Sequence, residues 1–141
     1  MYCARDFRTA FLEVFGDVIL GQRAGMGPCI PAKRWHHSML TTISPGPLKL
    51  CDFTTSESRS TMQTDLASLL HPDLTICQTW AGAVMHHPDE VDGILYPSRF
   101  TGAECLALFD GGRNIGIQET VPFSECAEAL ATLDAMTIAL V

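Results

Sequence analysis

The sequence has little positive charge and no long apolar run. Nine Lys and Arg residues accompany 16 Asp and Glu residues, which gives a formal net charge of −7. No stripe of basic residues of the kind that binds nucleic acid is present. The apolar runs are far too short to cross a bilayer, and the N-terminal residues MYCARDFR lack the apolar segment of a signal peptide. We therefore expect a cytoplasmic protein that binds neither nucleic acid nor a membrane.

The cysteines and histidines show no metal or redox motif. The six cysteines are each separated by more than twenty residues, so none of them forms the Cys-x-x-Cys pair of zinc sites and thioredoxin-like enzymes. The pairs His36-His37 and His86-His87 have no further ligand at metal-binding spacing. We therefore expect reduced thiols in a reducing compartment and no metal site.

Length and composition predict one folded domain over residues 1–141. Apolar residues make up 47% of the chain, which separates it from disordered proteins. A chain of 141 residues can bury roughly two-thirds of its unfolded surface, which is enough for a true core.

Local patterns predict helices and strands that do not alternate regularly. Strands are expected at 2–4, 35–43, 48–53, 92–96, 105–109 and 137–141, with 35–43 and 48–53 forming a hairpin. Helices are expected from Asp6 to about residue 16, at 62–70, at 74–85 and from Ser124 to 130, with loops at 21–34 and 54–61. This order favours an α+β fold with a mixed, mainly antiparallel sheet and flanking helices.

The segment Asp92–Arg99 is the strongest candidate for a binding feature. Asp92-Gly93 is a turn signal, Ile-Leu-Tyr is strand-prone, and Pro97 suits the end of a strand. Ser98 and Arg99 would then lie where a strand opens onto a loop, a common place for binding groups.

Residue chemistry alone assigns no reaction to the chain. Glu13 lies opposite the stripe formed by Phe7, Phe11 and Phe15 on the first helix, where a glutamate is usually solvated. Ser98 is not part of a G-x-S-x-G elbow or of a recognisable triad. These patterns by themselves indicate a globular α+β domain with one suggestive strand end.

Two segments resemble blocks of the RES-domain family. YCARDFRTAFLE resembles a strand ending Tyr-x-Ala that precedes a helix carrying a Glu, and Tyr2 and Glu13 are eleven positions apart, as in the family. HPDEVDGILYPSRFTGAECLALFD resembles the family's second block, which contains its Ser. The family is named for an Arg, a Glu and a Ser. Glu13 and Ser98 match the last two, but Arg5 and Arg8 are misplaced for the first, so we expect a domain without its N-terminal strands.

The resemblance implies a fold similar to ADP-ribosyltransferases, with a mixed sheet around an NAD cleft. RES toxins resemble NAD glycohydrolases or phosphorylases, so NAD is implied as a substrate and no cofactor is required. In that scheme Glu13 and Ser98 are catalytic, and Tyr2 and Arg99 bind the nucleotide. We therefore expect the Glu13 carboxylate and the Ser98 hydroxyl to line one cleft.

The resemblance also implies a partner. RES toxins are usually neutralised by a helical antitoxin with helix-turn-helix character, and a homo-oligomer is left open. One alternative is an inactive remnant that acts only as an antitoxin-binding module. Another is an ordinary globular domain in which Glu13 and Ser98 are structural. The sequence does not distinguish water, phosphate or a protein side chain as the acceptor.

Overall fold

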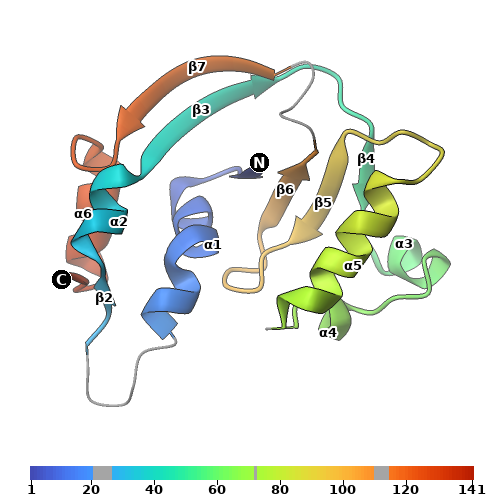
Figure 1. The fold of residues 1–141 in the computed structure, drawn as a ribbon, viewed down its shortest axis with the longest axis horizontal. Coiled ribbons are helices and arrows are strands. Elements are labelled where there is room, and N and C mark those ends of the chain that lie inside the picture. The colour runs from blue at the N-terminus through green and yellow to red at the C-terminus, as the bar shows by residue number, and fades with distance from the viewer. Residues whose placement is uncertain (21–26, 72, 110–114) are drawn as a thin grey trace. The chain divides into compact units, whose positions relative to one another are not determined.

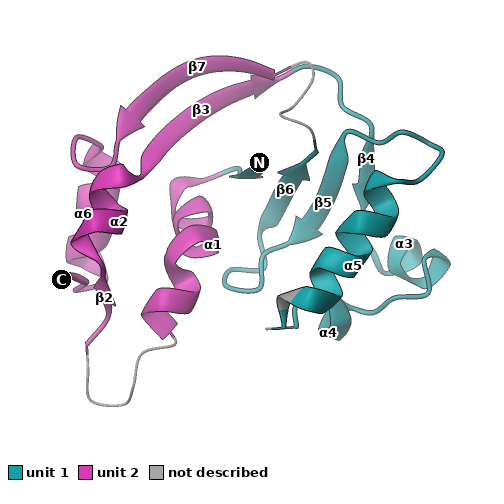
Figure 2. Ribbon diagram, in the orientation of Figure 1, with its two compact units in different colours: residues 1–5, 46–114 teal, residues 6–45, 115–141 magenta. Residues whose placement is uncertain are grey.

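The computed structural model describes residues 1–20, 27–71, 73–109 and 115–141 (Figure 1). The chain forms two compact units, shown in separate colours in Figure 2. Unit 1 contains Met1–Arg5 and Gly46–Asn114, and unit 2 contains Asp6–Pro45 and Ile115–Val141. Each unit is described by itself below. No helix among the described residues is both long enough and apolar enough to span a membrane.

Unit 1 is built on a four-stranded mixed sheet. The strand order is β1 (Tyr2–Ala4), β6 (Glu104–Leu108), β5 (Gly93–Pro97) and β4 (Leu50–Asp52). The β1–β6 and β6–β5 pairs are antiparallel, and β4 runs parallel to β5. The helices of this unit are α3 (Ser56–Thr61), α4 (Leu66–Leu69) and α5 (Leu74–Met85). Phe53, Val84 and Ile94 form a buried cluster that joins α5 to β5 and to the residue after β4.

Unit 2 combines three helices with two pairs of strands. The helices are α1 (Phe7–Leu20), α2 (Ala32–His37) and α6 (Ala127–Ala135). The short strands β2 (Cys29–Ile30) and β8 (Ala139–Leu140) pair in parallel. The strands β3 (Met39–Pro45) and β7 (Ile115–Pro122) form the long antiparallel ribbon that is visible in Figure 1. This architecture, together with unit 1, confirms the predicted α+β class.

An aromatic core holds unit 2 together, and the predicted stripe of α1 supplies much of it. Phe11 and Phe15 are 1% and 0% exposed, and the Trp35 and Phe123 rings meet edge to face with centroids 5.2 Å apart. Aromatic pairs at such separations add stabilisation beyond the area they bury. The helix continues to Leu20 rather than ending near residue 16, because Ile19 extends the same buried stripe.

Several predicted elements are confirmed. The strand at 2–4 is β1, the helix at 74–85 is α5, and the strands at 92–96 and 105–109 are β5 and β6 within one residue at each end. Asp6 caps α1 as expected, because its carboxylate accepts a 2.8 Å hydrogen bond from the Thr9 backbone N–H. The glycines expected to end the strand after Phe109 lie outside the described residues.

The predicted hairpin is wrong. Residues 32–37 form α2, which buries Trp35, and the strand that follows pairs with β7. β4 pairs instead with β5 in parallel, forty residues further along the chain. Strand propensity did not reveal these partners because tertiary contacts far apart in the sequence decide them.

Three other local predictions also need correction. Residues 56–61 form a helix rather than a loop, because the Thr55 hydroxyl accepts a hydrogen bond from the Ser58 N–H and caps it. The helix expected at 62–70 is reduced to α4, which Asp65 caps. The last helix begins at Ala127 after Cys126 rather than at Ser124. The long strand β7 was not predicted.

Candidate functional site

The strand that ends at the candidate site is fixed firmly at its beginning. The Asp92 N–H donates to the Lys49 carbonyl over 2.7 Å, and the Lys49 N–H donates to an Asp92 carboxylate oxygen over 2.8 Å. This reciprocal pair ties the start of β5 to the residues before β4. Gly93 then lies so close to β6 that a Cβ there would be 2.3 Å from the Ala107 carbonyl oxygen. Asp92-Gly93, which the sequence marked as a turn signal, therefore also contributes to strand pairing.

Ser98 lies directly after β5 and organises the turn that follows. Its Oγ accepts hydrogen bonds from the backbone N–H groups of Phe100 and Thr101, at 3.1 and 3.3 Å. Its own N–H donates to the Ala103 carbonyl at 2.7 Å, and its carbonyl accepts from the Gly102 N–H at 2.8 Å. The residue is 1% exposed. Such a serine is a turn-forming group of the kind that bonds its own following backbone.

Arg99 is the half-buried residue that follows Ser98 in this turn. Its guanidinium carbon lies 4.7 Å from the centroid of the Phe100 ring, within the range of a cation–π contact. The turn closes at Gly102, whose φ of +73° is favourable for glycine. Ser98, Phe100 and Gly102 thus form the local frame around Arg99.

The electrostatics of unit 1 are consistent with a positive charge near α5. Burial raises the pKa of the Cys77 thiol on α5, and the nearby charge of Arg99 acts in the opposite direction. The Cys77 thiol also donates to the Leu69 carbonyl at 3.0 Å. Cys77 therefore stays protonated at neutral pH and is a packing group rather than a nucleophile.

The aromatic candidate of unit 1 lies on its edge strand. Tyr2 is 76% exposed on β1 and lies opposite Ala107 of β6. The neighbouring strand contact is reinforced by an ion pair at 2.8 Å between Arg5 and Glu104, near the start of β6. The Tyr2 ring is therefore mostly outside the core of the unit.

Glu13 belongs to the other unit. It lies in the middle of α1 and is half-buried, so its helix does not present it fully to solvent. Ser98, Arg99 and Tyr2 all belong to unit 1, whereas Glu13 belongs to unit 2. The shared cleft for Glu13 and Ser98 accordingly stays a prediction.

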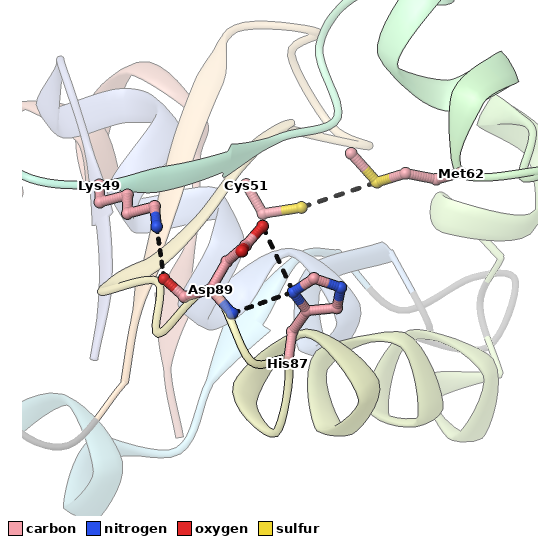
Figure 3. Close-up of polar contacts among 5 residues, drawn as sticks. All are labelled: Lys49, Cys51, Met62, His87 and Asp89. Atoms are coloured by element: carbon pink, nitrogen blue, oxygen red, sulfur yellow. Dashed lines mark hydrogen bonds and ion pairs between the residues drawn. The ribbon is translucent and has the colours of Figure 1, made fainter.

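A second group of polar residues surrounds the loop before β5 (Figure 3). The Lys49 ammonium donates to the Asp89 carbonyl, and the Asp89 carboxylate lies 3.5 Å from Nδ1 of His87. Nearby, the Cys51 thiol contacts the Met62 sulfur at 3.6 Å, and burial raises the pKa of Cys51. In the described part of the chain, no three His, Cys, Asp or Glu side chains gather as a metal site. The Lys49–Asp89 hydrogen bond ties this loop to the residue before β4.

Comparison with known proteins identifies the family. The family model described as the RES domain matches residues 1–126. The chain belongs to the RES-domain family. No curated protein and no solved structure gave a significant match.

The part of the chain beyond the RES-domain match still belongs to the fold. α6 and β8 lie after residue 126, yet Ala129 and Leu133 are buried and β8 pairs with β2. This C-terminal segment completes unit 2.

Sequence reasoning did not single out two residues of the turn after β5. Phe100 supports the Arg99 guanidinium, and Gly102 closes the turn with a positive φ. A serine followed four positions later by a glycine could have indicated a turn and so found Gly102, because both residue types favour turns. No comparable signal marks Phe100.

Proposed function

We propose that this RES-domain protein degrades NAD by cleaving the bond between nicotinamide and ribose, as the toxin of a toxin–antitoxin module. The observation that supports this most directly is the RES-domain match over residues 1–126, which includes both Glu13 and Ser98. Such a protein would act in the cytoplasm, where its substrate is.

The proposed chemistry needs one carboxylate close to the ribose. As the C1′–N bond breaks, the electron pair leaves with the nicotinamide nitrogen and positive charge develops on the ribose ring. A carboxylate beside the ring stabilises that charge, and Glu13 would supply it. A water oxygen then bonds to C1′ and its proton passes to solvent, or an anionic phosphate oxygen bonds to C1′ with no proton to lose. Nicotinamide is already a good leaving group, so no redox cofactor is required.

The residues of unit 1 would bind the rest of the nucleotide. Tyr2 presents an exposed ring, which can stack on a base or hydrogen-bond through its hydroxyl. Arg99 carries the positive charge that pairs with a phosphate, and the turn that begins at Ser98 holds it in place.

The deciding experiment measures nicotinamide release from NAD by the purified protein. The wild type should release nicotinamide, and Glu13→Gln should reduce the rate by at least about a hundredfold, since a lost electrostatic group in an active site typically costs that much. Glu128→Gln is the matched control, because it makes the same change at an exposed site on α6. Undiminished release by Glu13→Gln would overturn the assigned role, and no release by the wild type would favour the inactive antitoxin-binding module.

The partner is testable in the same assay. We propose a helical antitoxin with helix-turn-helix character, encoded by a neighbouring gene, that blocks the NAD site. Adding the purified product of that gene should stop nicotinamide release. Release that continues with excess neighbour protein would contradict the proposed pairing.

A further inference from the structure

We propose that Ser98 acts as a positioning residue, and that Arg99, supported on Phe100, is the group this turn presents to the diphosphate of the substrate. The inference rests on the proposed function for the identity of the substrate. It assigns to Ser98 a role that acts through its neighbours.

The hydroxyl of Ser98 is already engaged with its own backbone. It accepts from the Phe100 and Thr101 N–H groups, and the residue is 1% exposed. A nucleotide could reach this oxygen only if the turn opened and both N–H groups lost their acceptor. Leaving buried donors unsatisfied is costly, so the arrangement favours a serine that holds the turn.

The same hydrogen bonds fix the platform for Arg99. The Phe100 N–H donates to Ser98 Oγ, so the hydroxyl sets the position of the backbone that carries the Phe100 ring. That ring lies under the Arg99 guanidinium at 4.7 Å. A guanidinium supported on an aromatic face loses less conformational freedom when it binds an anion, and its flat fork suits two phosphate oxygens at once.

The turn is fastened at both ends, which makes it a rigid support. The Ser98 N–H and carbonyl bond to Ala103 and Gly102, so the loop between β5 and β6 is closed by backbone hydrogen bonds. Groups on a preorganised loop bind with a smaller entropic loss. The positioning role therefore predicts an effect on nucleotide binding rather than on the bond-breaking step.

The first test is a set of kinetic variants with NAD as substrate. Arg99→Gln, Phe100→Leu and Ser98→Ala should each raise KM roughly tenfold, the size expected when one charge-assisted contact is lost, with kcat changed much less. Phe100→Tyr and Ser98→Thr keep the ring and the hydroxyl, so they should retain most of the affinity. Arg5→Gln is the matched control, because it removes an exposed arginine elsewhere in unit 1.

Combining the variants separates positioning from direct contact. In an Arg99→Gln background, Ser98→Ala should cause little further loss, since both changes remove the same interaction. A large additional fall in kcat in that background would show that Ser98 contacts the reacting ribose and would overturn the proposal. If Ser98→Ala fails to fold, the Phe100→Leu and Arg99→Gln pair gives the corresponding cycle for the support of Arg99 by Phe100, and Ser98→Cys replaces Ser98→Ala in the first cycle.

A binding measurement keeps the inference distinct from the proposed function. Inorganic pyrophosphate, titrated by calorimetry, should bind the wild type and Arg5→Gln equally. It should bind Arg99→Gln and Phe100→Leu roughly tenfold more weakly. A wild type that binds pyrophosphate in this pattern but releases no nicotinamide would refute the NAD reaction alone. Equal binding by the wild type and Arg99→Gln would refute the role given to Arg99.

Discussion

Gly93 occupies a position in the sheet of unit 1 that leaves no room for a side chain. The nearest obstacle to a Cβ there is backbone of β6, which cannot rotate away. Gly93→Ala should therefore lower the free energy of unfolding by about 3 kcal/mol, the upper part of the usual cost of overpacking. Denaturant unfolding measures this directly.

Gly82 provides the matched control for that substitution. It lies inside α5, and a Cβ at this position would meet nothing within 4 Å. Gly82→Ala should raise the free energy of unfolding by about 0.5–1 kcal/mol, because alanine loses less backbone entropy in a helix. Similar effects of the two substitutions would contradict the close approach of β5 and β6.

The site residues show what residue types reveal and what they leave open. The sequence suggested that Ser98 and Arg99 follow a strand, and the structure confirms it. Burial of the Ser98 hydroxyl and the ring beneath Arg99 depend on the geometry of one turn, which residue identity does not specify. Glu13 could be placed on a helix from its position relative to Phe7, Phe11 and Phe15. The side chains that contact Glu13 depend on how distant segments pack, which the sequence does not reveal.

At the scale of elements, the Asp6 cap stabilises α1, the helix that carries Glu13. Asp6 accepts from the Thr9 N–H and from the Thr9 hydroxyl, and these hydrogen bonds hold the pKa of its carboxyl below the ordinary value. Asp6→Ala should lower the free energy of unfolding by about 1 kcal/mol at neutral pH.

The pH dependence of that loss has a definite sign. A carboxyl whose pKa is lower in the folded state stabilises the fold above its unfolded pKa, and this contribution is lost as pH falls through the folded pKa. The difference between wild type and Asp6→Ala should therefore shrink in acid. Asp6→Asn keeps a neutral acceptor at the cap, so its free energy of unfolding should not show this pH-dependent contribution. If the free energies of unfolding of the wild type and Asp6→Ala differ by the same amount at neutral and at acid pH, the role given to the Asp6 carboxylate is contradicted.

The end of α6 stores strain at Thr137. This residue has a φ of +53° just after the helix, where the Ile138 N–H returns to the Leu133 carbonyl at 2.9 Å. A β-branched residue is unfavourable in that conformation, and glycine is the usual choice. Thr137→Gly should raise the thermal midpoint, with a gain of roughly 0.5–1 kcal/mol. Thr132→Gly within the same helix is the control, and it should lower stability by about 0.5–1 kcal/mol. A loss of stability in both glycine variants would refute the strain at Thr137.

Local chemistry predicted elements better than it predicted their partners. α1, α5, β5 and β6 follow from stripes, caps and strand-prone runs that lie within a few residues of one another. The parallel pairing of β4 with β5, and the ribbon of β3 with β7, join segments separated by forty or more residues. α3 was missed because its Ser and Thr residues by themselves favour loops. In the structure, the hydrogen bond from Ser58 to the Thr55 hydroxyl caps this segment as a helix.

At the scale of the whole molecule, the proposed function assigns roles to Glu13 of unit 2 and to Arg99 of unit 1. Bound NAD should slow hydrogen exchange in α1 of unit 2 and in the 98–102 turn of unit 1. It should also raise the free energy of unfolding by about 2.7 kcal/mol at a hundred times its Kd. Exchange is best measured in Glu13→Gln, which we expect to leave the NAD intact. Protection limited to one unit would contradict the role proposed for the residue in the other.

The division of the chain between the two units also determines what a truncated chain retains. The backbone passes from one unit to the other between Arg5 and Asp6, again between Pro45 and Gly46, and finally between Asn114 and Ile115. Neither half of the molecule is encoded by a continuous stretch of the gene. A chain that stops before residue 115 therefore lacks β7, α6 and β8, so unit 2 is complete only when nearly the whole chain has been made.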